Sequence, residues 1–235
     1  MKIESKIVGI MQPYFFPYFE QFRLIAACDL WVVFDIAQFS RKSWITRNRI
    51  LNRDKGTSYL SMAIRHTGLD TRIKDAEIDN GKDWRAEIMN KLKVYQVGAP
   101  YYEVVRELIG DILGANYQTI STLNTAALKG VCGYLSIDTA IQVASALPLD
   151  IPDQCEPGEW ALHISKNLGA TEYRNAAGGK ALFDDKLYAS NGIKLSFHVH
   201  RPRTYRTGHF RFVEDLSVID WMMWNDRATL KEWLA

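Results

Sequence analysis

The protein has 235 residues, of which 47% are hydrophobic and 24% are charged, a composition that supports a folded core and argues against a disordered chain. Its net charge of +2 at pH 7 is too small to indicate a nucleic-acid-binding protein. Three cysteines without a C-x-x-C pair argue against a disulfide scaffold and a structural zinc site. No apolar run is long enough for a signal peptide or a membrane span, so we expect a cytoplasmic protein without a transmembrane segment.

The first part of the chain predicts a strand, a helix and a second strand. Short apolar runs at Ile7–Met11 and Leu30–Phe34 are typical of strands buried on both faces. Between them, apolar residues recur at helical spacing after Pro17. The basic, polar stretch 40–56 predicts a loop, and two further strands are predicted at Ser58–Ile64 and Lys74–Asp79.

The middle of the chain predicts three amphipathic helices. The first runs from Trp84 to about Gly98, the second from Pro100 to Gly114, and the third from Ile120 to Leu135. We interpret residues 82–136 as a helical insertion or subdomain between the two halves of a sheet.

Alternation of strands and helices then returns. Strands are predicted at 139–144, 172–174 and 193–199, with a helix at 158–168. Near the end, Ser217 is the expected cap of a last helix, with Asp220 completing a capping box. The pattern predicts one α/β domain over residues 1–235, with a mainly parallel, nucleotide-binding-like sheet covered by helices.

The segment Q-P-Y-F-F-P at residues 12–17 lies between the first strand and the first helix. In an open parallel sheet this position borders the ligand crevice, and a helix start offers free N–H groups to an anion. We therefore predict that Gln12, Tyr14 and Phe16 bind substrate. The alternative interpretation is a proline-stiffened turn whose aromatic residues belong to the core.

A second group of candidates follows the second strand and should meet the same edge of the sheet. Asp35 could act as a base or anchor a hydroxyl group, and amides and arginines could bind a sugar and a phosphate. The predicted binding residues here are Gln38, Trp44, Arg47, Asn48 and Arg49. A solvated basic loop is the alternative.

The segment 198–211 holds three histidines and four arginines without an acid, which favours an anionic partner. Arg201, Tyr205 and Arg206 are the predicted binding residues, and His200 is a predicted general base, in competition with His66. We predict no metal site, because the histidine pair here lacks a third ligand. An exposed loop or a charge-protected edge strand is the alternative.

Asn175 and Gly178 follow another predicted strand and complete the expected binding residues. Cys155 lies in a loop where a thiol could serve an acyl-thioester step, but its acidic neighbours argue against a lowered thiol pKa. His163, within an amphipathic helix, is interpreted as structural.

The strand, turn and helix at the start resemble the nucleotidyl-transferase division of the nucleotide-binding α/β proteins, in which a His-x-Gly-His signature occupies the turn. Gln12 and Tyr18 stand near those positions here, so the resemblance favours nucleotide-like binding without adenylyl transfer by that signature.

Four blocks together resemble the WbqC-like family over nearly the full chain. They are residues 12–18, residues 35–39, Trp44 with residues 47–50, and residues 216–220. The family's last block usually continues into a Phe-Asn-x-Gly-like segment. This chain has M-W-N-D at residues 223–226, without the glycine.

The resemblance implies a bacterial protein of surface-polysaccharide and O-antigen loci, and a transferase that decorates an amino sugar. The expected substrate is a nucleotide sugar, and the expected reaction is N-acyl or aminoacyl transfer from an acyl-CoA or an acyl carrier protein, with no tightly bound cofactor. The alternatives are a glycosyl- or nucleotidyltransferase with the same pocket, and a non-catalytic binding or assembly protein of the pathway.

Overall fold

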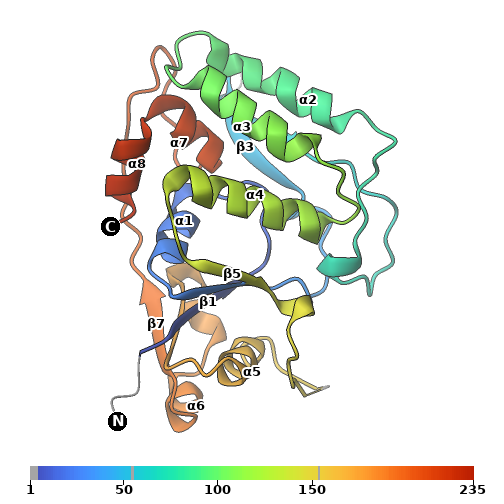
Figure 1. Cartoon of the computed structure of the whole chain (residues 1–235), viewed down its shortest axis with the longest axis vertical. Coiled ribbons are helices and arrows are strands. Elements are labelled where there is room, and N and C mark those ends of the chain that lie inside the picture. Colours follow the sequence, from blue (N-terminus) through green and yellow to red (C-terminus); the bar gives the residue numbers. More distant parts are fainter. Residues whose placement is uncertain (1–4, 54–55, 153) are drawn as a thin grey trace.

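A five-stranded parallel sheet forms the centre of the protein in a computed structural model that describes residues 5–53, 56–152 and 154–235 (Figure 1). The strand order is β5-β2-β1-β6-β7, and every neighbouring pair is parallel. The strands are β1 (Ile7–Met11), β2 (Leu30–Val33), β5 (Ala140–Val143), β6 (Glu172–Ala176) and β7 (Lys194–His198). The predicted α/β class with a mainly parallel sheet is therefore confirmed.

Helices cover both faces of the sheet because its central strands are apolar on both sides. Val8 and Ile10 pack in one core cluster with residues of α5 (Trp160–Asn167) and α6 (Asp185–Ser190). The opposite face, which includes Trp31, packs with α1 (Phe19–Ala26) and α4 (Ile120–Leu135). Gly9 leaves room for the ring of Trp31, its partner on the neighbouring strand, since a Cβ there would lie 2.6 Å from that ring.

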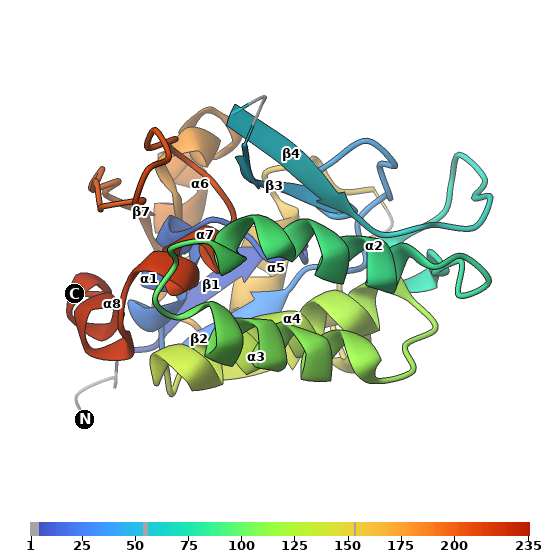
Figure 2. The ribbon, with the colours of Figure 1, turned by 90° about the horizontal axis from the view of Figure 1, so that it is seen from above.

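The helices of segment 82–136 share their core with the sheet. The segment holds α2 (Trp84–Lys91), η2 (Leu92–Gln96), α3 (Tyr102–Gly114) and α4, and their buried side chains belong to one apolar cluster with β2 and α1. Figure 2 shows α2, α3 and α4 side by side, with a β-hairpin lying beside α2. The α4 helix begins with its Thr119 cap and ends at Ser136 in the left-handed conformation.

Two predicted elements were wrong. Part of the predicted loop 40–56 is a strand, β3 (Arg47–Asn52), which pairs antiparallel with β4 (Gly56–Ser61). The predicted strand at 74–79 is instead a short 3-10 helix, η1 (Ile73–Asp75), followed by two isolated bridges. Two other 3-10 helices, η3 (Ala144–Ala146) and η4 (Ala177–Leu182), follow β5 and β6.

The chain ends in two short helices, α7 (Val218–Trp224) and α8 (Arg227–Trp233). Ser217 caps α7 as predicted, but the Asp220 carboxylate does not complete a capping box. It is fully buried and accepts hydrogen bonds from the hydroxyl groups of Tyr95 and Tyr205. Burial raises the pKa of Asp220 to about 6, although these hydrogen bonds act in the opposite direction.

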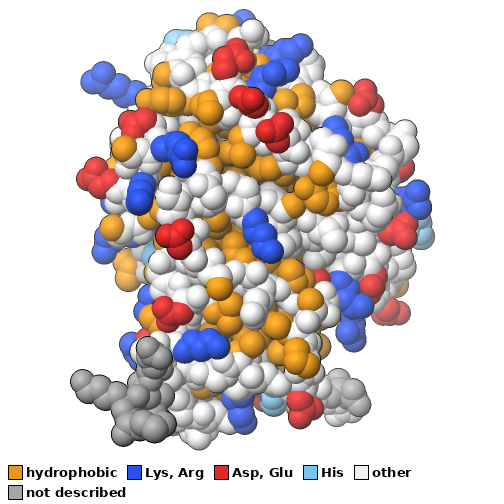
Figure 3. Space-filling view, in the orientation of Figure 1, with side chains coloured by type: hydrophobic (Ala, Val, Ile, Leu, Met, Phe, Trp, Pro, Cys, Tyr) orange, Lys and Arg blue, Asp and Glu red, His pale blue; other side chains and the backbone are white. Residues whose placement is uncertain are grey.

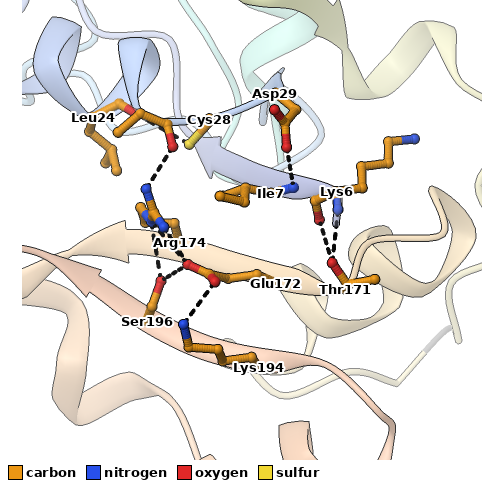
Figure 4. A network of polar contacts seen from close by, with 11 residues as sticks. Lys6, Ile7, Leu24, Cys28, Asp29, Thr171, Glu172, Arg174, Lys194 and Ser196 are labelled. Carbon is orange, nitrogen blue, oxygen red and sulfur yellow. Dashed lines mark hydrogen bonds and ion pairs between the residues drawn. The ribbon is translucent and has the colours of Figure 1, made fainter. Parts of the chain in front are cut away.

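An ion-pair network fastens β6 to β7 and to the end of α1 (Figure 4). Glu172 accepts from Arg174 at 2.6 Å, from Lys194 at 3.0 Å and from Ser196 at 2.6 Å. Burial alone would raise the pKa of Glu172, but these donors lower it to about 2. The carboxylate therefore stays ionised in the folded state at every pH at which the protein is expected to work.

No helix within the described part of the chain is long and apolar enough to cross a membrane. On the face shown in Figure 3, acidic and basic side chains are interspersed, so that face carries no extended basic patch.

Candidate functional site

A cavity of about 960 Å³ lies at the carboxyl ends of β1 and β6. From β1 the chain builds β2 and β5 on one side of the sheet, and later β6 and β7 on the other. The gap between β1 and β6 is thus the point where the strand order reverses, and open α/β sheets bind their ligands outside the strand ends at such a point. The topology places the cavity where this fold class places ligands.

The turn after β1 sends its side chains in two directions. Gln12, Tyr14 and Tyr18 line the cavity, whereas Phe15 and Phe16 are buried in the core. Phe16 adopts a φ of 41°, a left-handed conformation that is strained for an aromatic residue. Because the chain reverses direction at Phe16, the cavity is lined by Gln12 and Tyr14 before the two core phenylalanines and by Tyr18 after them.

Three buried side chains from distant segments hold this turn by its backbone carbonyl groups. Asn124 Nδ2 donates to Pro13 O at 2.7 Å and to Ile45 O at 2.8 Å. Asn48 Nδ2 donates to Phe16 O at 2.8 Å, and Ser217 Oγ donates to the same oxygen at 2.7 Å. A strained backbone conformation persists only where several surrounding contacts hold it in place, and these hydrogen bonds are such contacts.

The main cavity is lined chiefly by aromatic and aliphatic side chains, with a few amides. Six of the predicted binding residues line it, namely Gln12, Tyr14, Gln38, Trp44, Asn175 and Gly178. The Gln38 Nε2 donates to Leu69 O at 2.8 Å, and the Asn175 Oδ1 accepts from the Ala176 N–H at 2.7 Å. A hydrogen bond to one of its two polar atoms therefore fixes the orientation of each side-chain amide.

Charge is scarce in the main cavity. Of its described lining residues, only Asp70 and Arg72 are ionised at neutral pH, and both are exposed side chains at its edge. Burial raises the pKa of the Tyr14 hydroxyl, so Tyr14 enters the cavity as a neutral hydrogen-bonding group. The interior therefore suits a ring or a sugar better than a bare anion.

A side pocket of about 300 Å³ adjoins the cavity and shares Tyr14, Tyr18 and Trp44 with it. It adds three residues of the predicted site, Asn48, Arg49 and His200. The Arg49 guanidinium lies 5.7 Å from the centre of the Trp44 ring and donates to Asp215 O at 3.3 Å. This pocket therefore adds a guanidinium and an imidazole, together with the Asp215 side chain, to the residues of the main cavity.

A smaller pocket of about 120 Å³ lies on the other side of Tyr18 and contains Glu20, Gln21, His198 and His200. The His198 Nε2 is 3.6 Å from Glu20 Oε2, and the buried Gln21 Oε1 accepts no hydrogen bond from any described residue. Arg23 donates to Glu20 at 2.9 Å.

Burial alone would raise the pKa of Glu20, but the nearby His198 imidazole, the hydrogen bond from Arg23 and the charges of Arg23 and His200 lower it. Glu20 is therefore an ionised carboxylate beside two imidazoles. Because it also lies in the first turn of α1, it disfavours the anion that the sequence pattern predicts at this helix start.

The remaining predicted residues lie outside the main cavity. Asp35 is buried and accepts hydrogen bonds from Ser121 Oγ at 2.8 Å and from Ser145 Oγ at 2.7 Å. It therefore links the end of β2 to α4 and η3 and does not line the cavity. His66 is exposed and lines none of the three pockets described above. Phe16 belongs to the core.

The basic residues predicted to bind phosphate are dispersed. Arg47 lies over the Tyr59 ring at 4.5 Å, and Arg201 donates to the backbone oxygen of Ala235. The Tyr205 hydroxyl donates a hydrogen bond to Asp220, and Arg206 is exposed and does not line the main cavity. Within the segment 198–211, His198 and His200 line the two side pockets described above, and Arg201 and Arg203 line a further small pocket of about 30 Å³ beside Tyr18.

Several residues that line these pockets were not among the predicted binding residues, and they include Tyr18, Glu20, Gln21, Arg72 and Trp160. Tyr18 and Glu20 adjoin the predicted turn and could have been found from it. Arg72 and Trp160 reach the cavity only through tertiary packing, which no local pattern indicates.

Comparisons with known proteins agree with this picture at the level of family. The model of the WbqC-like protein family matches residues 12–232. The chain is 25% identical over 232 residues to the uncharacterized protein Rv1507c of Mycobacterium tuberculosis, and the match covers 97% of each chain. No solved structure matches the chain.

Proposed function

We propose a reaction for this chain, which belongs to the WbqC-like family. It binds a nucleotide-linked amino sugar in the main cavity and transfers an acyl group from a carrier thioester to the sugar amine. The resemblance to this family indicates the class of substrate, and the position and lining of the cavity support the binding of such a substrate.

The cavity at the β1–β6 switch point is the observation that carries the proposal. Its volume of about 960 Å³ is at the upper end of the range of roughly 300–1,000 Å³ typical of small-molecule sites. Aromatic side chains such as Tyr14, Phe34 and Trp160 can stack on a base or a sugar ring, and Gln12 and Asn175 can read amide and hydroxyl groups. Such a lining fits a large, mostly uncharged ligand.

The phosphates belong in the side pocket. The turn after β1 has no glycine-rich loop, and Glu20 opposes an anion at the start of α1. Arg49 offers a guanidinium held by stacking on Trp44 and by one backbone contact. A diphosphate that leaves the main cavity past Tyr14 would therefore meet Arg49.

His200 is the proposed base, since it lies in both side pockets and shares one of them with the Glu20 carboxylate. The amine nitrogen attacks the thioester carbonyl, a C–N bond forms, and the C–S bond breaks. His200 takes one proton from the amine nitrogen and then gives it to the leaving thiolate, which departs as the free thiol. No protein nucleophile is required, in agreement with the raised pKa values of all three thiols.

Thermal shift with a panel of nucleotide diphosphate amino sugars tests binding first. A ligand at 100 times its Kd adds about 2.7 kcal/mol to the stability, or roughly 5–10 °C for a chain of this size. Gln12→Ala and Arg49→Met should reduce the shift, whereas Arg206→Ala, a basic residue away from the main cavity, should not. The proposal fails if no member of the panel shifts the wild-type protein, and a stable complex with another protein would then favour the assembly role.

Mass spectrometry of the sugar tests the reaction. With an acyl-CoA or an acylated carrier protein, wild type should yield the N-acyl sugar, and His200→Gln should bind the sugar normally but acylate it at least about 100-fold more slowly. Release of the free nucleoside diphosphate without acylation would replace acyl transfer with glycosyl transfer.

A further inference from the structure

The structure brings together three potential metal ligands that the sequence pattern did not connect. Cys155, Glu159 and His163 each offer a donor atom, and these atoms all lie within 4.8 Å of one another. Glu159 and His163 are four positions apart at the start of α5, so they lie on one side of it, and Cys155 precedes the turn that leads into this helix. The cluster is separate from His198 and His200, the pair considered in the sequence.

The donor groups have few other partners. Among the described residues, neither the Cys155 thiol nor the His163 ring takes part in a hydrogen bond or ion pair. The Glu159 carboxylate accepts one hydrogen bond, from the Glu156 N–H at 3.1 Å, which orients it. All three side chains are half-buried, so an ion could enter from solvent without a change in the fold.

The turn that carries Cys155 toward α5 is firmly packed. Tyr188 Oη donates to Gly158 O at 3.0 Å, and the Glu159 N–H donates to Glu156 O at 2.9 Å. A Cβ on Gly158 would lie 2.0 Å from Leu182 O, so only glycine allows this approach. The three donors are therefore positioned by the fold before any ion binds.

Local charge favours a cation over a reactive thiol. The carboxylates of Glu159 and Glu156 both act electrostatically on the Cys155 side chain. Their negative charge attracts a divalent ion, which would displace the thiol proton on binding.

We propose that Cys155, Glu159 and His163 form a site for a divalent transition metal, and that this metal is Zn²⁺. Sulfur, imidazole nitrogen and carboxylate oxygen together suit Zn²⁺ better than Mg²⁺ or Ca²⁺, which prefer oxygen alone. Donors of a tetrahedral zinc ion lie about 3.5 Å apart, so the observed cluster closes around an ion with small side-chain rotations. Three protein ligands leave a fourth position for water or a substrate atom.

The site adjoins the wall of the main cavity. Pro157 and Trp160, which lie between these ligands in the sequence, line that cavity. A bound ion would fasten the turn to α5 and so fix this part of the wall. The proposal stands independently of the acyl-transfer reaction.

Zinc binding by the purified, tag-free protein tests the site directly. After chelation and dialysis, competition with a chromogenic chelator should show one Zn²⁺ per chain. Cys155→Ser, Glu159→Gln and His163→Asn should each weaken binding more than about tenfold. His209→Asn, at an exposed histidine elsewhere, is the matched control and should bind as wild type does.

Cobalt substitution identifies the ligands independently of affinity. Co²⁺ in the wild-type protein should give a sulfur-to-metal charge-transfer band, and Cys155→Ser should abolish it. Zn²⁺ should raise the melting temperature of wild type but not of this variant, whose melting without metal also reports whether it is folded. Binding without the band, or equal zinc affinity in wild type and Cys155→Ser, would overturn the proposal.

Discussion

Replacing Asn124 should loosen the turn that forms one wall of the main cavity. Its side-chain amide donates to Pro13 O at 2.7 Å and to Ile45 O at 2.8 Å, in a fully buried environment. Asn124→Ala leaves both carbonyl groups without these donors, and a buried polar group without a partner costs about 1–3 kcal/mol. Since backbone relaxation offsets part of that cost, we expect a loss of about 2–4 kcal/mol, or roughly 5–15 °C in melting temperature.

An isosteric change separates hydrogen bonding from packing. Asn124→Asp keeps the shape but presents a carboxylate to two carbonyl oxygens, so it should destabilise at least as much as Asn124→Ala at neutral pH. Burial and repulsion should raise the pKa of the new carboxyl group, so stability should recover in part as the pH falls and the group regains a donor.

Equilibrium urea unfolding measures both variants, with Asn116→Ala as the control. Asn116 is exposed and accepts only from Gln118 Nε2, so its replacement should change the stability by less than about 0.5 kcal/mol. If Asn124→Ala cost no more than this control, the two hydrogen bonds would not be what holds the turn.

Two further predictions concern buried carboxylates. The folded-state pKa of Asp220 is raised to about 6 from 3.8, so its ionisation should remove about 3 kcal/mol of stability as the pH rises from below 3.8 to above 6. Asp220→Asn should lack this loss, which urea unfolding at several pH values would show as a pH-dependent difference from wild type. The folded-state pKa of Glu172 is lowered to about 2, so its contribution is present above its ordinary value of 4.5 and is lost as the pH falls toward 2. Glu172→Gln should lower the free energy of unfolding by about 1–3 kcal/mol at neutral pH, because solvent screens the ion pair with the exposed Lys194 in part. A difference in stability from wild type that persisted at low pH would contradict this account.

The parallel sheet and the edge of the sheet at which the main cavity lies could be predicted from the sequence, because both depend on local patterns. Continuous apolar runs identified β1 and β2, and the end of β1 located the cavity. The β3 strand was missed because its buried positions include Asn48, a polar residue whose inward side chain holds the turn. An inward-facing amide is invisible to a search for alternating hydrophobicity.

The individual roles of site residues depended on tertiary contacts and were harder to predict. Asp35 follows a strand, as a catalytic acid would, but serines from α4 and η3 satisfy its carboxylate. His200 gains significance only beside Glu20, which is 180 positions away in the sequence. Arg41, Arg47 and Arg49 are clustered in the sequence, but each contacts a different partner, namely Arg65 O, the Tyr59 ring and the Trp44 ring.

The position of β1 between β2 and β6 has a consequence for how the protein is made. The start of β1 meets the segment before β6 through Lys6 and Thr171, which lie 165 positions apart. At about 5–20 residues per second, a ribosome needs roughly 8–33 s to add that length of chain. During this interval β1 can pair with β2, but its other edge has no partner in the sheet. The binding cavity therefore cannot exist until late in synthesis, and the nascent chain depends on protection of that open strand edge.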